Sequence, residues 1–220
     1  MSAPLPALSL LETRVLGVLV EKQQTVPDAY PLTLNALVAG CNQKSSRDPV
    51  LEASDAEVQA AVDHLRMLSL VIESSGGRVM RYAHNLPRVL DVPSQAAALI
   101  ATLMLRGPQT VGELRINSER LHRFADVSAT LAFLRELEAR PAGTLVAELP
   151  RQPGARETRW MHLLSGAPAI TPATVEPESG VVDTSDELAA LRADLARVEA
   201  ELDELKSVVA RLRAELGLTS

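Results

Sequence analysis

Amide and cationic side chains follow one another at the end of the second predicted helix, where they could bind nucleic acid. Asn42, Gln43, Lys44 and Arg47 lie within six residues and enter a polar loop. Lys and Arg donate hydrogen bonds to phosphates, and Asn and Gln can pair with adenine edges. A structural role is the alternative, because cations suit a helix C-terminus and Asn favours turns.

A second group of cationic side chains lies further along the chain. It consists of Arg115, Arg120, Arg123, Arg151, Arg156 and Arg159. The acidic residues near them in sequence are Glu113, Glu119 and Glu157. These arginines could follow a phosphate backbone. Dispersed, solvated arginines are the alternative, because Arg supplies 19 of the 22 cationic residues.

Residues that could catalyse a reaction or hold a metal are scattered. His64, His84, His122 and His162 are far apart in sequence and show no metal-ligand spacing. Cys41 follows apolar residues, so we expect a small buried side chain rather than a nucleophile. We therefore expect no enzyme, no bound metal and no cofactor.

The elements that must position these residues follow from apolar spacing. The pattern predicts two sets of three helices, at about 9–23, 32–42 and 55–69, and at about 94–106, 110–118 and 126–139. Each set precedes a predicted hairpin, formed by 71–73 with 78–82 and by 144–149 with 158–163. Three helices followed by a hairpin is the order of a winged helix.

An internal repeat supports two related domains. Val58, Val62, Leu65 and Leu68 have the same spacing as Val127, Leu131, Leu134 and Leu137. We predict a mainly α fold with small β-hairpin wings, in which residues 1–92 and 93–165 are tandem winged-helix domains of helix-turn-helix type.

The end of the chain has a different composition. Proline and glycine predict a flexible linker at 166–184, and a heptad repeat predicts a coiled-coil helix at 185–220. Its apolar positions are Leu188, Leu191, Leu195, Val198, Leu202, Leu205, Val209, Leu212 and Leu216. Opposite charges at flanking positions favour a parallel homodimer. One amphipathic helix that packs on its own domain is the alternative.

The helices expected to enter a major groove are poorly suited to phosphates. In DNA-binding winged helices the third helix usually has a polar and basic exposed face. Here the predicted outward residues are Asp55, Gln59, Asp63 and Arg66 in the first domain, and Ser128, Ala129, Ala132, Arg135 and Glu136 in the second. One face is acidic and the other has small residues, which suits packing against protein.

Long motifs resemble those of a known family. They include the runs at 11–17, 21–23, 30–32, 41–50 and 105–115, and those at 151–154 and 159–164. Together they resemble the YceH-like family of uncharacterised bacterial proteins over almost the whole chain. The resemblance implies two winged-helix domains in tandem and no defined activity.

Composition and charge narrow the class of partner. Five aromatic residues are too few for a surface on which bases stack. The net charge of −6 divides into −2 for residues 1–92, +2 for 93–165 and −6 for 166–220, so the bulk charge does not exclude DNA. One cysteine and no apolar run long enough to cross a membrane indicate a soluble cytoplasmic protein without a membrane partner.

Two functions remain after these exclusions. The first is a homodimeric, DNA-associated protein or transcriptional regulator. The alternative is a protein-interaction scaffold that uses its winged helices and coiled coil without base readout. Fold analogy alone is a weak basis for choosing between them.

Overall fold

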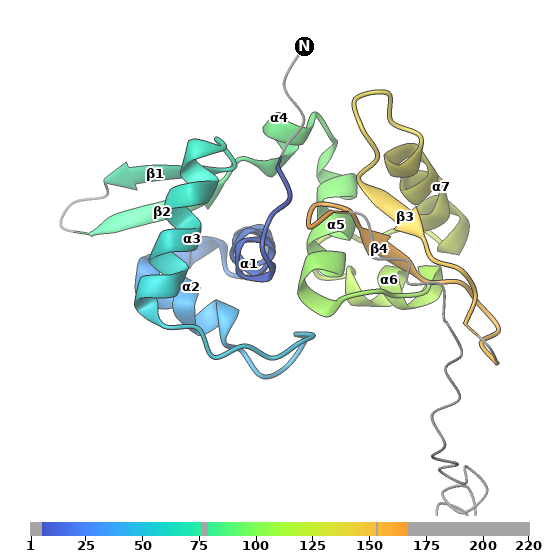
Figure 1. Cartoon of the computed structure of the whole chain (residues 1–220), viewed down its shortest axis with the longest axis horizontal. Helices are drawn as coiled ribbons and strands as arrows, with labels where there is room; N and C mark the ends of the chain where they lie inside the picture. The colour runs from blue at the N-terminus through green and yellow to red at the C-terminus, as the bar shows by residue number, and fades with distance from the viewer. Residues whose placement is uncertain (1–5, 76–78, 153, 167–220) are drawn as a thin grey trace, which may run out of the picture. The chain divides into compact units, whose positions relative to one another are not determined.

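Three helices followed by a β-hairpin occur twice along the chain in the computed structural model (Figure 1). The structure describes residues 6–75, 79–152 and 154–166. The first half, residues 6–92, contains α1 (Leu10–Thr25), α2 (Leu34–Cys41), α3 (Asp55–Met67), β1 (Val71–Ser75) and β2 (Met80–His84). A short 3-10 helix, η1 (Pro27–Ala29), lies between α1 and α2.

The second half, residues 93–166, repeats this order. It contains α5 (Ser94–Arg106), α6 (Val111–Asn117), α7 (Val127–Glu138), β3 (Val146–Glu148) and β4 (Trp160–His162). A short helix, α4 (Leu86–Leu90), links the halves. The predicted order of the longer helices and hairpins is confirmed, whereas α4 and η1 were not predicted.

The two hairpins are built alike. β1 pairs antiparallel with β2, with Glu73 opposite Tyr82, and β3 pairs antiparallel with β4. Each hairpin gains one more bridge from the residue two positions before its second helix: Leu32 pairs with Tyr82, and Gln109 pairs with Trp160. This detail repeats between the halves and agrees with the internal sequence repeat.

Hydrogen-bonded caps explain where several helices begin. Ser9, Ser54 and Thr110 each accept a bond from the backbone N–H three residues later. In each case that later residue is a glutamate whose carboxylate bonds back to the capping residue's N–H. These reciprocal bonds satisfy donors that the first turn leaves without helical partners.

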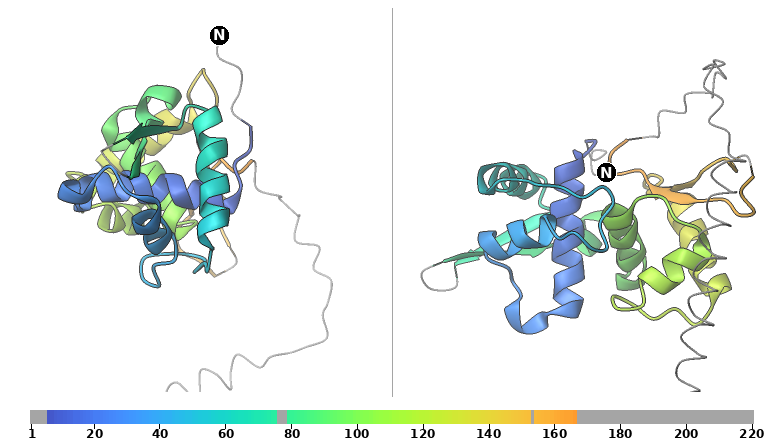
Figure 2. Two further views of the ribbon diagram at one scale, coloured as in Figure 1. Left: turned by 90° about the vertical axis from the view of Figure 1, so that its left-hand side faces the viewer. Right: turned by 90° about the horizontal axis from the view of Figure 1, so that it is seen from below.

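Helix α1 joins the two halves. Figures 1 and 2 show it between α2 and α3 on one side and α5 on the other. Val15, Leu16 and Leu19 of α1 have no exposed surface. Gly17 permits close contact with α5, since a Cβ there would lie 3.0 Å from the Leu105 side chain.

By its contacts the chain divides between Ala169 and Ile170. Both halves lie in the first of the two units, so the predicted division between residues 92 and 93 stays a prediction. The predicted linker and all nine heptad positions lie outside the described residues. In the described part of the chain, no helix has the length and apolar character needed to cross a membrane.

Candidate nucleic-acid interface

The amide candidates at the end of α2 make internal contacts. Asn42 Nδ2 donates to the Ala53 carbonyl at 2.8 Å, and Asn42 Oδ1 accepts from the Ala53 N–H at 2.8 Å. Gln43 Nε2 donates to the Ser45 carbonyl at 2.9 Å, and its Oε1 accepts from Lys22 at 3.3 Å. Asn42 therefore closes the loop that leads to α3, and Gln43 holds the turn at its start.

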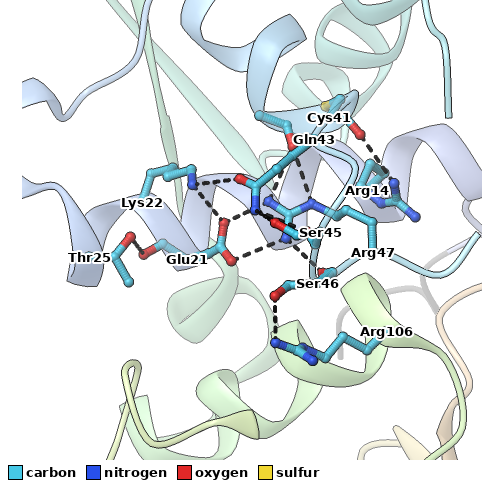
Figure 3. Close-up of polar contacts among 11 residues, drawn as sticks. Arg14, Glu21, Lys22, Thr25, Cys41, Gln43, Ser45, Ser46, Arg47 and Arg106 are labelled. Atoms are coloured by element: carbon cyan, nitrogen blue, oxygen red, sulfur yellow. Dashed lines mark hydrogen bonds and ion pairs between the residues drawn. The ribbon is translucent and has the colours of Figure 1, made fainter. Parts of the chain in front are cut away.

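Arg47 points into the protein rather than to solvent. Its guanidinium forms a bidentate pair with Glu21 of α1, at 2.7 and 3.2 Å, and it also donates to the Gly40 carbonyl at 3.2 Å (Figure 3). The side chain of Arg47 has no exposed surface, and that of Glu21 is 14% exposed. Burial alone would raise the pKa of Glu21, but the hydrogen bonds and charges of Arg47 and Lys22 lower it.

Arg14 is a second buried arginine close to this pair. Its guanidinium donates to the Cys41 carbonyl at 3.1 Å and to the Pro49 carbonyl at 2.6 Å. Arg14 and Glu21 are seven residues apart on α1, so they lie on one face of the helix. Sequence analysis missed both, although two charges on one face of an apolar helix were a usable signal.

The loop between α2 and α3 also contacts the second half. Arg106 at the end of α5 donates to the Ser46 hydroxyl at 2.7 Å (Figure 3). The Asp48 N–H donates to the Leu105 carbonyl at 2.8 Å. Of the four candidates here, only Lys44 is exposed, and it has no side-chain partner among the described residues.

In the second half, Arg159 fixes the base of the second hairpin against α6. Its guanidinium donates to the Pro108 carbonyl at 2.8 Å and lies 3.4 Å from the Glu113 carboxylate. The loop that precedes Arg159 contains Arg151 and Arg156, both exposed. In Figure 1 this loop extends from the strands on the same side as α6.

The other arginines of this group lie on α6 and just after it. Arg115 is partly buried and Arg120 is exposed. Arg123 is 85% exposed and lies 3.7 Å from Glu119, a surface pair that contributes little. Within the described residues no carboxylate is at ion-pair distance from Arg115, Arg120, Arg151 or Arg156. These four guanidinium groups are available to an external anion.

The exposed faces of α3 and α7 offer no such groups. Arg66 on α3 pairs with Asp63 at 3.2 Å and with Glu73. Arg135 on α7 pairs with Glu138 at 2.8 Å and with Glu148 at 2.5 Å. The single arginine of each helix, which lies in its last turn, is therefore neutralised by two carboxylates.

Among the other groups that could do chemistry, Cys41 is buried and His84 and His162 are partly buried. Burial raises the pKa of the Cys41 thiol to about 12, so the thiol stays protonated at neutral pH. Burial lowers the pKa of His84 and of His162 to about 4, so both rings are neutral at pH 7. In the described ranges, no three His, Cys, Asp or Glu side chains come together as metal ligands.

Comparison with known proteins places this structure in a family. A family model described as "Protein of unknown function, DUF480" matches residues 8–155. The chain belongs to the DUF480 family. A UPF0502 protein of Dechloromonas aromatica is 57% identical over 211 residues, which cover 95% of this chain and 97% of that protein. A UPF0502 protein of Leptothrix cholodnii is 57% identical over 216 residues, 96% of each chain. The predicted membership of an uncharacterised bacterial family is confirmed.

Proposed function

We propose that each half of this DUF480 protein is a winged helix and that the protein associates with DNA through the phosphates. The contact surface is formed by α6, the segment after it and the loop between β3 and β4. The observation on which this proposal depends is the contact of Arg159 with Pro108 and Glu113, which holds the end of the hairpin loop beside α6. Arginines from both segments can then bind one backbone.

This assignment differs from DNA binding through the third helix. The arginines of α3 and α7 are already paired with carboxylates, and Asp55 and Asp63 on α3 would repel phosphates. Base readout through these helices is therefore disfavoured, and the proposed binding depends on backbone charge. Asn42, Gln43 and Arg47 are left out of the surface because their side chains make internal contacts.

Self-association completes the proposal. A parallel homodimer through positions 188–216 would place two arginine surfaces on one assembly. Two weak phosphate-binding surfaces in one assembly raise the overall affinity by avidity. We propose no catalytic activity, in line with the scattered histidines and the protonated Cys41 thiol.

The test is a titration of a short fluorescent DNA duplex with the full chain at several low salt concentrations. Arg120→Gln combined with Arg156→Gln should weaken binding. The plot of log affinity against log salt concentration should also become less steep, by about 0.9 in slope for each lost phosphate contact. Arg66→Gln combined with Arg88→Gln removes the same charge from the first half and should leave binding unchanged. Absence of binding at low salt, or equal losses in both variants, would refute the proposal.

A protein-interaction scaffold is the second candidate function. The observation in its favour is that the first half has exposed apolar side chains around its hairpin, with Met67 75%, Ile72 50% and Val79 53% exposed. Exposed apolar surface of this kind is typical of protein contact sites. Affinity capture from lysate, with and without nuclease, separates the two functions. Partners that contact the protein directly are still captured after nuclease treatment, whereas those held through DNA are lost.

A further inference from the structure

The loop that follows α2 has a run of backbone donors without partners. Among the residues that the structure describes, no backbone or side-chain acceptor lies at hydrogen-bond distance from the N–H groups of residues 43–47. Ser45 is exposed and Ser46 is partly buried, so the run lies at the surface. Because a backbone N–H that the fold leaves unpaired is bound by water or by a ligand, these donors are available to an external acceptor.

Internal hydrogen bonds to the carbonyls of this loop fix the direction of its donors. Gln43 Nε2 donates to the Ser45 carbonyl at 2.9 Å, and the Arg47 guanidinium donates to the Ser46 carbonyl at 2.9 Å (Figure 3). In a trans peptide the N–H points opposite to the C=O. The Arg47 N–H therefore points away from the buried guanidinium. Arg47 is 7% exposed although its side chain has no exposed surface, so the exposed part is its backbone.

Ser46 gives this loop an unusual backbone conformation. Its φ is 59°, in the left-handed region that residues other than glycine rarely adopt. A left-handed residue in a turn is the conformation in which successive N–H groups form a nest, a concave site for an anion. The loop therefore has the backbone geometry of an anion site before any ligand binds.

Arg106 brings a guanidinium from the second half to this loop. It donates to the Ser46 hydroxyl at 2.7 Å and is partly buried, and within the described ranges no carboxylate is at ion-pair distance from it (Figure 3). Burial lowers the pKa of Arg106, Glu21 raises it, and Arg47 lowers it. Because Glu21 and Arg47 pair with each other, their effects on Arg106 oppose one another. Arg106 is thus a cation beside the loop without a carboxylate of its own.

The charges around the loop are positive in sum. Five cations and three carboxylates lie in residues 42–53 or bond to them, namely Arg14, Lys22, Lys44, Arg47 and Arg106 with Glu21, Asp48 and Glu52. Glu21 is occupied by Arg47, and the Asp48 carboxylate lies beside Gly107, 3.4 Å from a Cβ built there. Lys44 is exposed. Arg106 and Lys44 are therefore the two cations that can approach an anion bound at residues 45–47.

We infer that residues 45–47, together with Arg106 and Lys44, bind a terminal phosphate, either inorganic phosphate or the phosphate monoester of a small molecule. The N–H groups donate to its oxygens, and the two cations balance its charge. Such a phosphate carries up to about two charges and three acceptor oxygens at neutral pH. Each phosphate of a DNA strand carries one charge and is linked on both sides. The donor set suits the terminal phosphate better.

A phosphate at this site would connect the two halves. The loop belongs to the first half and Arg106 to the second, and the Asp48 N–H already donates to the Leu105 carbonyl at 2.8 Å. A ligand that binds only the folded protein stabilises it. The site is separate from the arginines proposed to bind DNA, and the inference does not depend on that function.

The test is an NMR titration of the full chain with inorganic phosphate and with glycerol phosphate, at an ionic strength held constant with sodium chloride. The amide resonances of residues 45–47 should shift and saturate, and the probe that binds more tightly identifies the form of the phosphate. A short DNA duplex should leave these resonances in place. Absence of a saturable shift, or a duplex that shifts them as strongly, would overturn the inference.

Matched variants locate the site. Arg106→Gln should weaken phosphate binding about tenfold, because a charge-assisted hydrogen bond is lost. Lys44→Glu should also weaken it, and this exposed position keeps the test valid if Arg106→Gln fails to fold. Arg88→Gln removes one charge from an exposed position on α4 and should leave binding unchanged. Equal losses in Arg88→Gln and Arg106→Gln, or full affinity in Lys44→Glu, would refute the site.

Discussion

Arg47 illustrates how burial changes the role of a cationic side chain. A solvent-exposed arginine offers its five N–H donors to phosphate, but those of Arg47 are directed to Glu21, Gly40 and Ser46. The pair with Glu21 joins the loop after α2 to the end of α1. Its role is therefore to hold the first half together and to fix the loop that meets α5.

This role leads to a stability prediction for the single variant Arg47→Met. Removal of the guanidinium leaves the Glu21 carboxylate largely buried, with Lys22 at 3.1 Å as its one remaining ion-pair partner among the described residues. The free energy of unfolding should fall by about 3 kcal/mol, the usual cost of breaking a buried pair from one side. Urea denaturation followed by circular dichroism measures it.

The control for this prediction neutralises the partner as well. Arg47→Met combined with Glu21→Gln removes the uncompensated charge, so the double variant should recover part of the lost stability. A double variant that is less stable than Arg47→Met alone would contradict the role assigned to the pair.

The candidate residues show what sequence can and cannot reveal at this scale. Donor types in the run from Asn42 to Arg47 were recognisable from sequence, but their partners were not. Glu21 is 26 residues from Arg47, and the loop brings the two together only after α1 and α2 have packed. Arg120 and Arg156, in contrast, are exposed in the structure, as their sequence context predicts for arginines at the protein surface.

At the scale of elements, the packing of α2 on α1 depends on one small residue. A Cβ built on Gly40 would lie 2.6 Å from Cγ1 of Val18, closer than side chains approach in proteins. The glycine therefore sets the distance between the two helices. Because Arg47 and Arg14 bond to carbonyls at Gly40 and Cys41, this distance also places the buried arginines.

Gly40→Ala should therefore destabilise the protein, by about 1–3 kcal/mol as an overpacked core does. Gly112→Ala in α6 is the matched control, because no atom lies within 4 Å of the added Cβ. That control should be neutral or stabilising by up to about 1 kcal/mol, since alanine favours helix. Thermal unfolding of both variants provides the comparison, and equal effects would show that the contact with Val18 does not limit the packing.

The elements themselves were largely predictable because their signals are local. Val58, Val62 and Leu65 of α3 all have no exposed surface, as their helical spacing predicts. The short helix α4 was missed because five residues are too few to show a helical period, and proline, here Pro87, is more typical of a break than of a helix interior. The bridges of Leu32 and Gln109 to the hairpins were also missed, since single-residue pairings depend on tertiary packing.

At the scale of the whole molecule, the two candidate functions use different halves. The arginines proposed to contact DNA phosphates lie in the second half, and the exposed apolar side chains around the first hairpin, Met67, Ile72 and Val79, lie in the first half. The acidic excess of the chain falls on residues 166–220. The proposed DNA phosphate surface and the exposed apolar side chains of the first hairpin lie in different halves, so they do not compete for one site.

The heptad segment determines whether these surfaces act singly or in pairs. Deletion of residues 185–220 should give a monomer by light scattering, while the thermal unfolding of residues 1–165 stays largely unchanged. Leu195→Asp with Leu202→Asp should have the same effect on mass, because charges in the apolar seam prevent association. Ala193→Asp with Ala200→Asp adds the same charge outside the seam and should preserve the oligomer.

DNA affinity at low salt should fall with the monomeric variants and not with this control, since avidity requires two linked surfaces. An oligomer that survives the deletion would place the interface in residues 1–184 and remove the heptads from the proposed function.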